Sequence, residues 1–126
     1  MDPSDEVRLV VPATPEFLRL ARVTASGIAS RLGFTFDDVE DLRLAIDELC
    51  FSLIGRGRPG TVLLRYVVRP DALEVEGYGQ FANGAGEPVL TDLSERILNA
   101  LVDEHETSAS SDGGPRFRLL KRRGGT

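Results

Sequence analysis

The chain has 126 residues, of which 15 are basic and 20 are acidic, and its formal net charge at pH 7 is −5. This length fits one domain over residues 1–126, and the negative charge works against a general phosphate-binding surface. Hydrophobic residues account for 41% and charged residues for 28%, which is typical of a globular protein and argues against disorder. No apolar run is long enough to span a bilayer, and the acidic N-terminus lacks the pattern of a signal peptide. A cytoplasmic protein without a membrane role is therefore predicted.

The first predicted elements are a strand over 7–11 and a helix over 15 to about 32. Apolar side chains occupy alternate positions of the strand, and Pro12 ends it. Thr14 is typical of a helix N-cap, and Gly33 is typical of a helix end. The apolar stripe expected to face inward consists of Phe17, Ala21, Thr24, Ala25, Ile28 and Leu32.

A second helix is predicted over about 36–54, because Thr35 and Asp38 resemble a weak capping box. Its expected core stripe consists of Val39, Leu42, Ile46, Leu49 and Leu53. The only base between residues 37 and 48 is Arg43, so the exposed side of this helix is strongly negative. Such a face fits either a solvated helix or a partner surface.

The second half of the chain predicts a hairpin, a third helix and a last strand. The segments, in chain order, are a strand at 61–69, a strand at 73–77, a glycine-rich loop at 77–88, a helix at 91–104, a loop at 107–115 and a strand at 117–121. The side chains of the third helix expected to point inward are Leu93, Ile97, Leu98 and Leu101. The predicted fold is an α+β two-layer sandwich, in which a mixed, mostly antiparallel sheet of about four strands is covered on one face by three helices.

The sequence contains few residues that could bind a metal or act as a nucleophile. His105 is the one histidine, at the expected end of the third helix, and Cys50 is the one cysteine. A zinc site is therefore not predicted, and Cys50 fits a small buried side chain better than a redox thiol. The C-terminus is locally basic through Arg116, Arg118, Lys121, Arg122 and Arg123. A solvated end is the favoured interpretation of these residues, and a nucleic-acid patch is the alternative.

Glu48 and Ser52 lie one turn apart on the second predicted helix, at the edge of its apolar stripe. Such a pair could bind a polar ligand, although an ordinary surface pair fits the spacing equally well. The glycine pairs at 77–79 and 84–86 offer backbone that a phosphate could approach, but neither belongs to a recognised phosphate-binding motif.

The order of these elements, with ARVT at 21–24 and DLRLAIDELCFSLI at 41–54, resembles RsbW-type anti-sigma factors. Those proteins are serine-protein kinases built on the GHKL ATPase (Bergerat) fold. The resemblance implies ATP and magnesium as cofactors and Glu48 as the general base. It also implies that Ser52 replaces a magnesium-binding asparagine, and that Gly77 and Gly79 are the glycines of the nucleotide motif.

Four positions depart from the family pattern. Val75 stands in place of the aspartate that accepts from adenine, and Ser52 offers one neutral oxygen to a cation. The glycine–leucine run is not recognisable in 84–93, and Pro115 replaces a threonine that usually meets the nucleotide. Losing these partners would cost on the order of 1–3 kcal/mol each, so ATP binding and kinase activity are predicted to be weak or lost.

The resemblance also implies protein partners. Arg22, within ARVT, matches a main contact to sigma factors and anti-anti-sigma proteins, and Arg19 and Glu16 share its helix. The predicted function is an anti-sigma factor that sequesters an alternative sigma factor, is released by an anti-anti-sigma (STAS) partner and forms a homodimer.

Three alternatives remain at this stage. The first is an active serine kinase in which other residues replace the missing nucleotide contacts. The second is a nucleic-acid-binding protein acting through the basic tail, which predicts steep salt dependence. The third is a degenerate ATPase fold whose partner is not a sigma factor.

Overall fold

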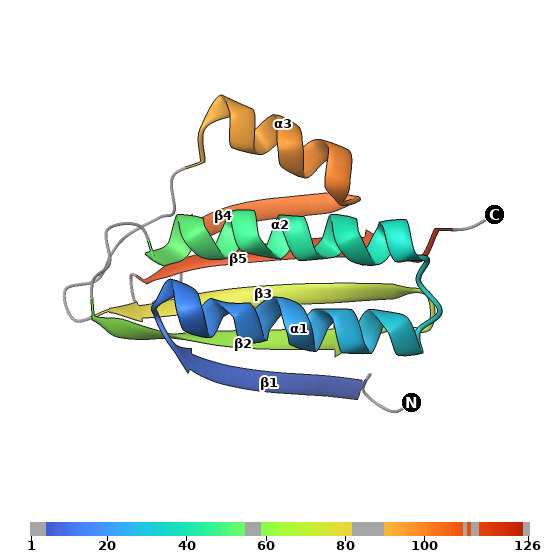
Figure 1. Cartoon of the computed structure of the whole chain (residues 1–126). Helices are drawn as coiled ribbons and strands as arrows, with labels where there is room; N and C mark the ends of the chain where they lie inside the picture. Colours follow the sequence, from blue (N-terminus) through green and yellow to red (C-terminus); the bar gives the residue numbers. More distant parts are fainter. Residues whose placement is uncertain (1–4, 55–58, 82–89, 110, 112–113, 125–126) are drawn as a thin grey trace.

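A computed structural model of the chain describes residues 5–54, 59–81, 90–109, 111 and 114–124 (Figure 1). The strands are β1 (Asp5–Pro12), β2 (Gly60–Val68), β3 (Ala72–Phe81), β4 (Glu104–Ala109) and β5 (Pro115–Arg122). The helices are α1 (Pro15–Arg31), α2 (Phe36–Ile54) and α3 (Asp92–Leu101). Among these described residues, no helix is long and apolar enough to cross a membrane.

The strands form one five-stranded sheet in the order β1-β2-β3-β5-β4. Every neighbouring pair is antiparallel. Helices α1 and α2 lie side by side across one face of this sheet, and α3 lies beside α2 at the β4 edge (Figure 1). The predicted α+β two-layer sandwich is confirmed, with one strand more than expected and a fully antiparallel rather than mixed sheet.

The boundaries of α1 and α2 agree closely with the sequence prediction because local signals fix them. Gly33 follows α1 with a φ of +84°, a conformation that glycine adopts without strain. Thr35 Oγ1 accepts a hydrogen bond from the Asp38 amide at 3.1 Å, as the capping pattern predicts. Thr14 occupies the N-cap position of α1, but its side chain makes no capping hydrogen bond.

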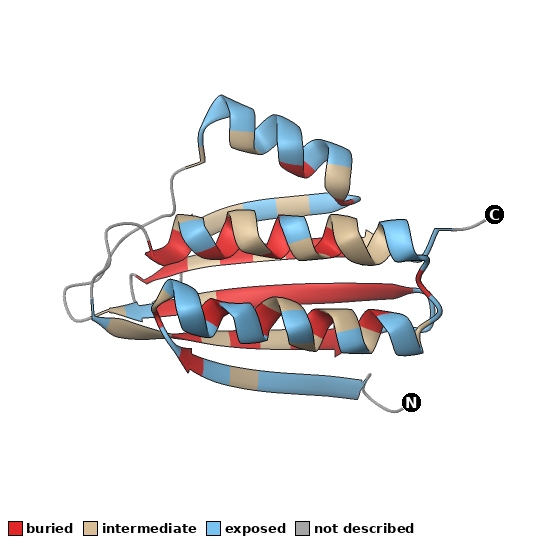
Figure 2. Ribbon diagram, viewed as in Figure 1, coloured by how far each residue is buried: buried red, intermediate tan, exposed pale blue. Residues whose placement is uncertain are grey.

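The core lies between the two helices and the sheet, and Figure 2 shows the buried residues on the facing sides of these elements. The predicted α2 stripe is buried apart from the half-buried Val39. The predicted α1 stripe is rotated by about one residue, since Phe17 is 42% exposed and Leu18 is buried in its place. Ala21 belongs to the buried stripe, and its carbonyl accepts a hydrogen bond from the buried Tyr66 hydroxyl at 2.8 Å.

Three predictions for the second half of the chain are wrong. The strand β3 continues to Phe81, so residues 77–81 are not a loop. The rest of the predicted loop, residues 82–88, lies outside the described residues. Helix α3 ends at Leu101, and the polar segment Glu104–Ala109 forms an edge strand in place of a helix end and a loop. His105 therefore lies in β4, where its Nε2 is 2.8 Å from Asn99 Oδ1.

The expected inward face of α3 is also only partly correct. Leu98 is buried and Leu101 is half-buried, but Leu93 and Ile97 are exposed. Helix α3 lies at the edge of the sheet and packs against α2 and β4, so only one side of its apolar face finds a partner among the described residues.

Candidate functional site

The corner between α2 and α3 contains the two polar residues that the sequence selects on α2. Glu48 Oε2 accepts a hydrogen bond from Ser94 Oγ, on the first turn of α3, at 2.6 Å. The Ser52 hydroxyl donates to the Leu49 carbonyl of its own helix at 2.5 Å. Glu48 and Ser52 thus lie one turn apart, as predicted, but each has a different hydrogen-bond partner.

The strand β3 brings Val75, Gly77 and Gly79 to the face of the sheet that the helices cover. Val75 is fully buried and has no polar atom in its side chain. A Cβ atom on Gly77 would lie 2.3 Å from Phe117 Cε2, and one on Gly79 would lie 2.9 Å from Pro115 Cγ. Side chains of this chain therefore fill the space in front of both glycines.

Two of these residues lack groups that the resemblance implies for binding ATP and magnesium. Val75 cannot accept a hydrogen bond from an adenine amino group, and Ser52 offers a single neutral hydroxyl oxygen in place of an asparagine side chain. Within the described residues, no group of three or more His, Cys, Asp or Glu side chains could hold a metal ion. The second glycine pair, at 84–86, lies outside the part of the chain that the structure describes.

The predicted partner residues lie on α1. Glu16 and Arg19 are exposed, whereas Arg22 Nη1 donates to Asp47 Oδ2 of α2 at 2.7 Å. The Arg22 and Asp47 side chains are 31% and 28% exposed, so this ion pair lies at the surface between the two helices. The sequence selects Arg22 but gives no sign of its pairing with Asp47.

Four exposed apolar side chains lie on the same two helices as this ion pair. Leu20 and Val23 of α1, and Leu44 and Phe51 of α2, are all exposed. Because the buried stripes of both helices face the sheet, these four residues lie on the side that faces away from it. We call Leu20, Val23, Leu44 and Phe51 the helical patch.

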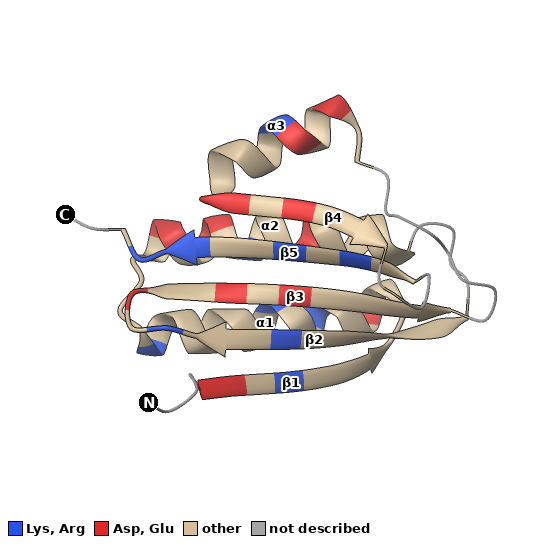
Figure 3. Ribbon diagram, turned by 180° about the vertical axis from the view of Figure 1, so that it is seen from behind, with Lys and Arg blue, Asp and Glu red and all other residues tan. Residues whose placement is uncertain are grey.

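The opposite face of the molecule has a different character. Figure 3 shows acidic and basic residues alternating across the strands on this side, which no described helix covers. Glu74 and Glu76 of β3 are each only 7% exposed, because arginine side chains from neighbouring strands lie over them. The ion pairs extend across all five strands, from Glu6 of β1, which pairs with Arg65, to Glu104 and Glu106 of β4, and we call these paired residues the sheet network.

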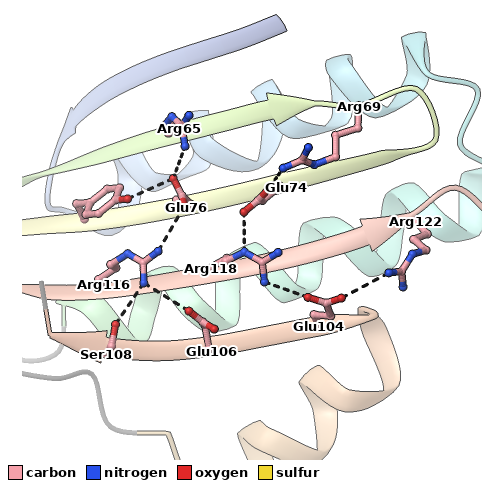
Figure 4. Close-up of polar contacts among 11 residues, drawn as sticks. Arg65, Arg69, Glu74, Glu76, Glu104, Glu106, Ser108, Arg116, Arg118 and Arg122 are labelled. Atoms are coloured by element: carbon pink, nitrogen blue, oxygen red, sulfur yellow. Dashed lines mark hydrogen bonds and ion pairs between the residues drawn. The ribbon is translucent and has the colours of Figure 1, made fainter. Parts of the chain in front are cut away.

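Each buried glutamate of the sheet network binds two arginines (Figure 4). Glu74 accepts from Arg69 at 2.5 Å and from Arg118 at 2.6 Å. Glu76 accepts from Arg65 at 2.7 Å and from Arg116 at 3.3 Å. The prediction that Arg116 and Arg118 belong to a solvated basic end is therefore wrong, since both lie in β5 and form these pairs.

Burial and ion pairing shift the pKa values of a few groups. Burial raises the pKa of the Cys50 thiol, which keeps the side chain neutral and agrees with the prediction of a small buried residue. Desolvation alone would raise the pKa of Glu74, but the hydrogen bonds from Arg69 and Arg118 outweigh it and lower the pKa. Glu74 therefore remains ionised in the folded protein at neutral pH.

The roles of Asp47, Ser94 and the sheet network are not predicted from the sequence. Asp47 and Ser94 are ordinary polar residues, and only the packing of the helices brings them to Arg22 and Glu48. The sheet network had a recognisable signal, since glutamates alternate with apolar residues at 73–77 and arginines do so at 116–119.

Several known proteins are similar to this chain. RsbW from Bacillus velezensis, a serine-protein kinase, is 33% identical over 121 residues, which cover 93% of this chain and 72% of that protein. The serine-protein kinase RsbW from Bacillus subtilis (strain 168) is 32% identical over 122 residues, covering 94% and 73%. RsbW from Bacillus pumilus is 35% identical over 130 residues, covering 85% and 80%.

A crystal structure of the RsbU and RsbW domains of Rv1364c from Mycobacterium tuberculosis has a similar fold. Its TM-score is 0.67 at 17% sequence identity, and the match covers 95% of this chain and 32% of that chain. At this level of identity the likeness concerns the fold alone. No family model matches the chain.

Proposed function

The chain belongs to the RsbW family of serine-protein kinases, and we propose that it acts as an anti-sigma factor whose ATP binding and kinase activity are weak or lost. It binds and sequesters an alternative sigma factor, and an anti-anti-sigma (STAS) protein releases that sigma factor. The observation that carries this proposal is the exposed helical patch, which lies on the two helices that the Arg22–Asp47 pair joins.

The two faces of the molecule support a protein partner on the helical side. On the sheet side, both buried carboxylates are already paired with two arginines each, so a partner would gain little there. On the helical side, four large apolar side chains face solvent near Arg22 and Arg19. Aromatic residues and arginine, here Phe51 and Arg22, are enriched in the core of protein interfaces.

The β3 residues at the positions of the family's nucleotide motif support a loss of catalysis. Val75 offers no acceptor, and Phe117 and Pro115 occupy the space in front of Gly77 and Gly79. Each missing polar contact costs about 1–3 kcal/mol, and two such losses would weaken micromolar binding by about 30-fold or more, toward the millimolar range.

The second candidate function is an active serine-protein kinase. One observation favours it: the Glu48 carboxylate lies 2.6 Å from the Ser94 hydroxyl, which is the distance at which a general base engages a serine. In this alternative, Glu48 remains catalytic and other residues hold the nucleotide.

Two titrations test the proposal. Isothermal titration of the purified protein with ATP and magnesium should give no measurable binding, and tight magnesium-dependent binding would favour the kinase. Titration with the alternative sigma factors of the source organism, purified one by one, should identify one that binds with a Kd of about 1 μM or lower. If none of them binds, the chain is not an anti-sigma factor.

A further inference from the structure

The ion pair between α1 and α2 lies beside the helical patch, because Asp47 is one helix turn from both Leu44 and Phe51. Arg22 Nη1 donates to Asp47 Oδ2 at 2.7 Å, and about a third of each side chain is exposed. A partner that covers the helical patch must therefore contact this pair or displace it.

The position of Arg22 leaves one of its donors without an acceptor. Its Nε is buried and makes no hydrogen bond within the described residues. A guanidinium carries five N–H groups in a rigid fork, and a buried donor without an acceptor destabilises the conformation that contains it. Arg22 is therefore bound to Asp47 in an arrangement that satisfies it only in part.

The surroundings of the pair define the chemistry of a partner that could satisfy Arg22 better. The apolar side chains of Leu20 and Val23 lie on the same helix, and Leu44 and Phe51 lie on α2. Arg19, about one turn from Arg22, makes no ion pair in the described part of the chain. The complementary partner is an amphipathic helix that presents a carboxylate among apolar side chains, because a carboxylate can bind a guanidinium fork through two hydrogen bonds.

We propose that Asp47 holds Arg22 in the free protein, and that a carboxylate on an amphipathic helix of the sigma factor replaces Asp47 when the complex forms. This inference rests on the proposed function and adds the regulation of the docking surface to it. Asp47 weakens the complex, because Arg22 must leave it before the partner can bind. The same competition disfavours partners without a suitably placed carboxylate, since they cannot replace the contact that Arg22 loses.

The test uses the substitution Asp47→Asn, which keeps the size of the side chain and removes its charge. The matched control is Glu40→Gln, which removes the same charge from the same helix about two turns away. Glu40 pairs with Arg43 of its own helix and does not contact Arg22. The binding constant of the sigma factor is measured by isothermal titration for the wild type, both variants, Arg22→Ala and the double variant Arg22→Ala/Asp47→Asn.

Asp47→Asn should raise the affinity about five- to tenfold, and Glu40→Gln should change it by no more than about twofold. Arg22→Ala should lower the affinity about tenfold or more, and adding Asp47→Asn to it should give no further change. An equal gain from Glu40→Gln, a gain from Asp47→Asn that persists without Arg22, or no gain at all would overturn the inference while leaving the anti-sigma function intact. If the wild type binds none of the sigma factors, the function and the inference both fail.

Discussion

The two glycines of β3 illustrate how one residue type can satisfy two different demands. In the family pattern, Gly77 and Gly79 belong to a nucleotide motif. In this structure each faces side chains so closely that a Cβ atom would overlap them. Packing alone is thus a sufficient reason for glycine at both positions, and nucleotide binding is not needed to explain them.

Substitution of Gly77 tests this packing role. Gly77→Ala would place a Cβ atom 2.3 Å from Phe117 Cε2, so the core must shift. We expect the free energy of unfolding to fall by about 1–3 kcal/mol in urea titrations. The additional substitution Phe117→Leu should recover part of this loss by removing the ring.

The matched control for this prediction is Gly27→Ala on α1. No atom lies within 4 Å of a Cβ built at Gly27, and alanine favours a helix over glycine by up to about 1 kcal/mol. This control should be as stable as the wild type or more stable. Equal stability of Gly77→Ala and the wild type would show that the packing at Gly77 is not restrictive.

Among the elements, α3 has the weakest attachment to the rest of the fold. Its only buried residue is Leu98, and Leu93 and Ile97 are exposed. The hydrogen bond from Ser94 to Glu48 and that from Lys121 Nζ to the Leu101 carbonyl, at 2.6 Å and 2.7 Å, hold its two ends. Local opening of α3 should therefore require less free energy than opening of α1 or α2.

Removal of the Ser94 hydroxyl tests this attachment. Ser94→Ala should increase amide hydrogen exchange in α3 by about threefold to tenfold, because a lost hydrogen bond costs roughly 1 kcal/mol of local stability. Exchange in α1 should not change. The control is Ser26→Ala, whose hydroxyl donates within α1 to the Arg22 carbonyl, and it should leave α3 unaffected. Unchanged exchange in α3 of Ser94→Ala would mean that other contacts hold the helix.

The elements also show what the sequence can and cannot predict. Gly33 encodes the end of α1 and Thr35 encodes the start of α2, so the sequence predicts these two boundaries almost to the residue. The edge strand β4 was missed because Glu104–Ala109 has no apolar alternation, and its pairing with β5 comes from a distant segment. The extension of β3 was missed because glycine disfavours strands, whereas pairing with β2 on one side and β5 on the other keeps residues 77–78 extended.

The same distinction holds for the candidate site. Glu48, Ser52 and Arg22 were selected from the sequence, and the structure places them on the helices that were predicted to carry them. Their partners were not predictable, because Ser94 and Asp47 approach them only through tertiary packing. A residue type in a helical pattern indicates which face it occupies, but it does not indicate which side chain lies opposite.

At the scale of the whole molecule, the two faces have opposite chemistry. The helical side exposes large apolar residues, and the sheet side carries paired charges (Figure 3). The sheet network makes one side of the molecule sensitive to acid. The pKa of Glu74 is lower in the folded state than its ordinary value, so the folded state binds fewer protons than the unfolded chain at mildly acidic pH.

The stability contributed by Glu74 should be fully present above about pH 5 and should be lost as the pH falls through the lowered pKa of the folded state. Between about pH 5 and pH 3, the unfolding free energy of Glu74→Gln should fall less steeply with decreasing pH than that of the wild type. The difference in slope should correspond to at most about one bound proton. The measurement is a series of urea titrations at each pH.

Glu95→Gln is the control for the acid response, since Glu95 is exposed on α3 and forms no ion pair in the part of the chain that the structure describes. Its pH dependence should match that of the wild type. A Glu74→Gln curve parallel to the wild-type curve would show that Glu74 does not contribute to the acid response.

The strand order has a consequence for the way in which this protein is synthesised. The strand β5 follows all the other described elements in sequence, yet it lies inside the sheet, between β3 and β4. Until the ribosome has released this segment, β4 has no hydrogen-bonding neighbour, and one edge of β3 is unpaired. A nascent chain should therefore remain protease-sensitive until β5 has left the ribosome, and should then acquire its resistance in one step.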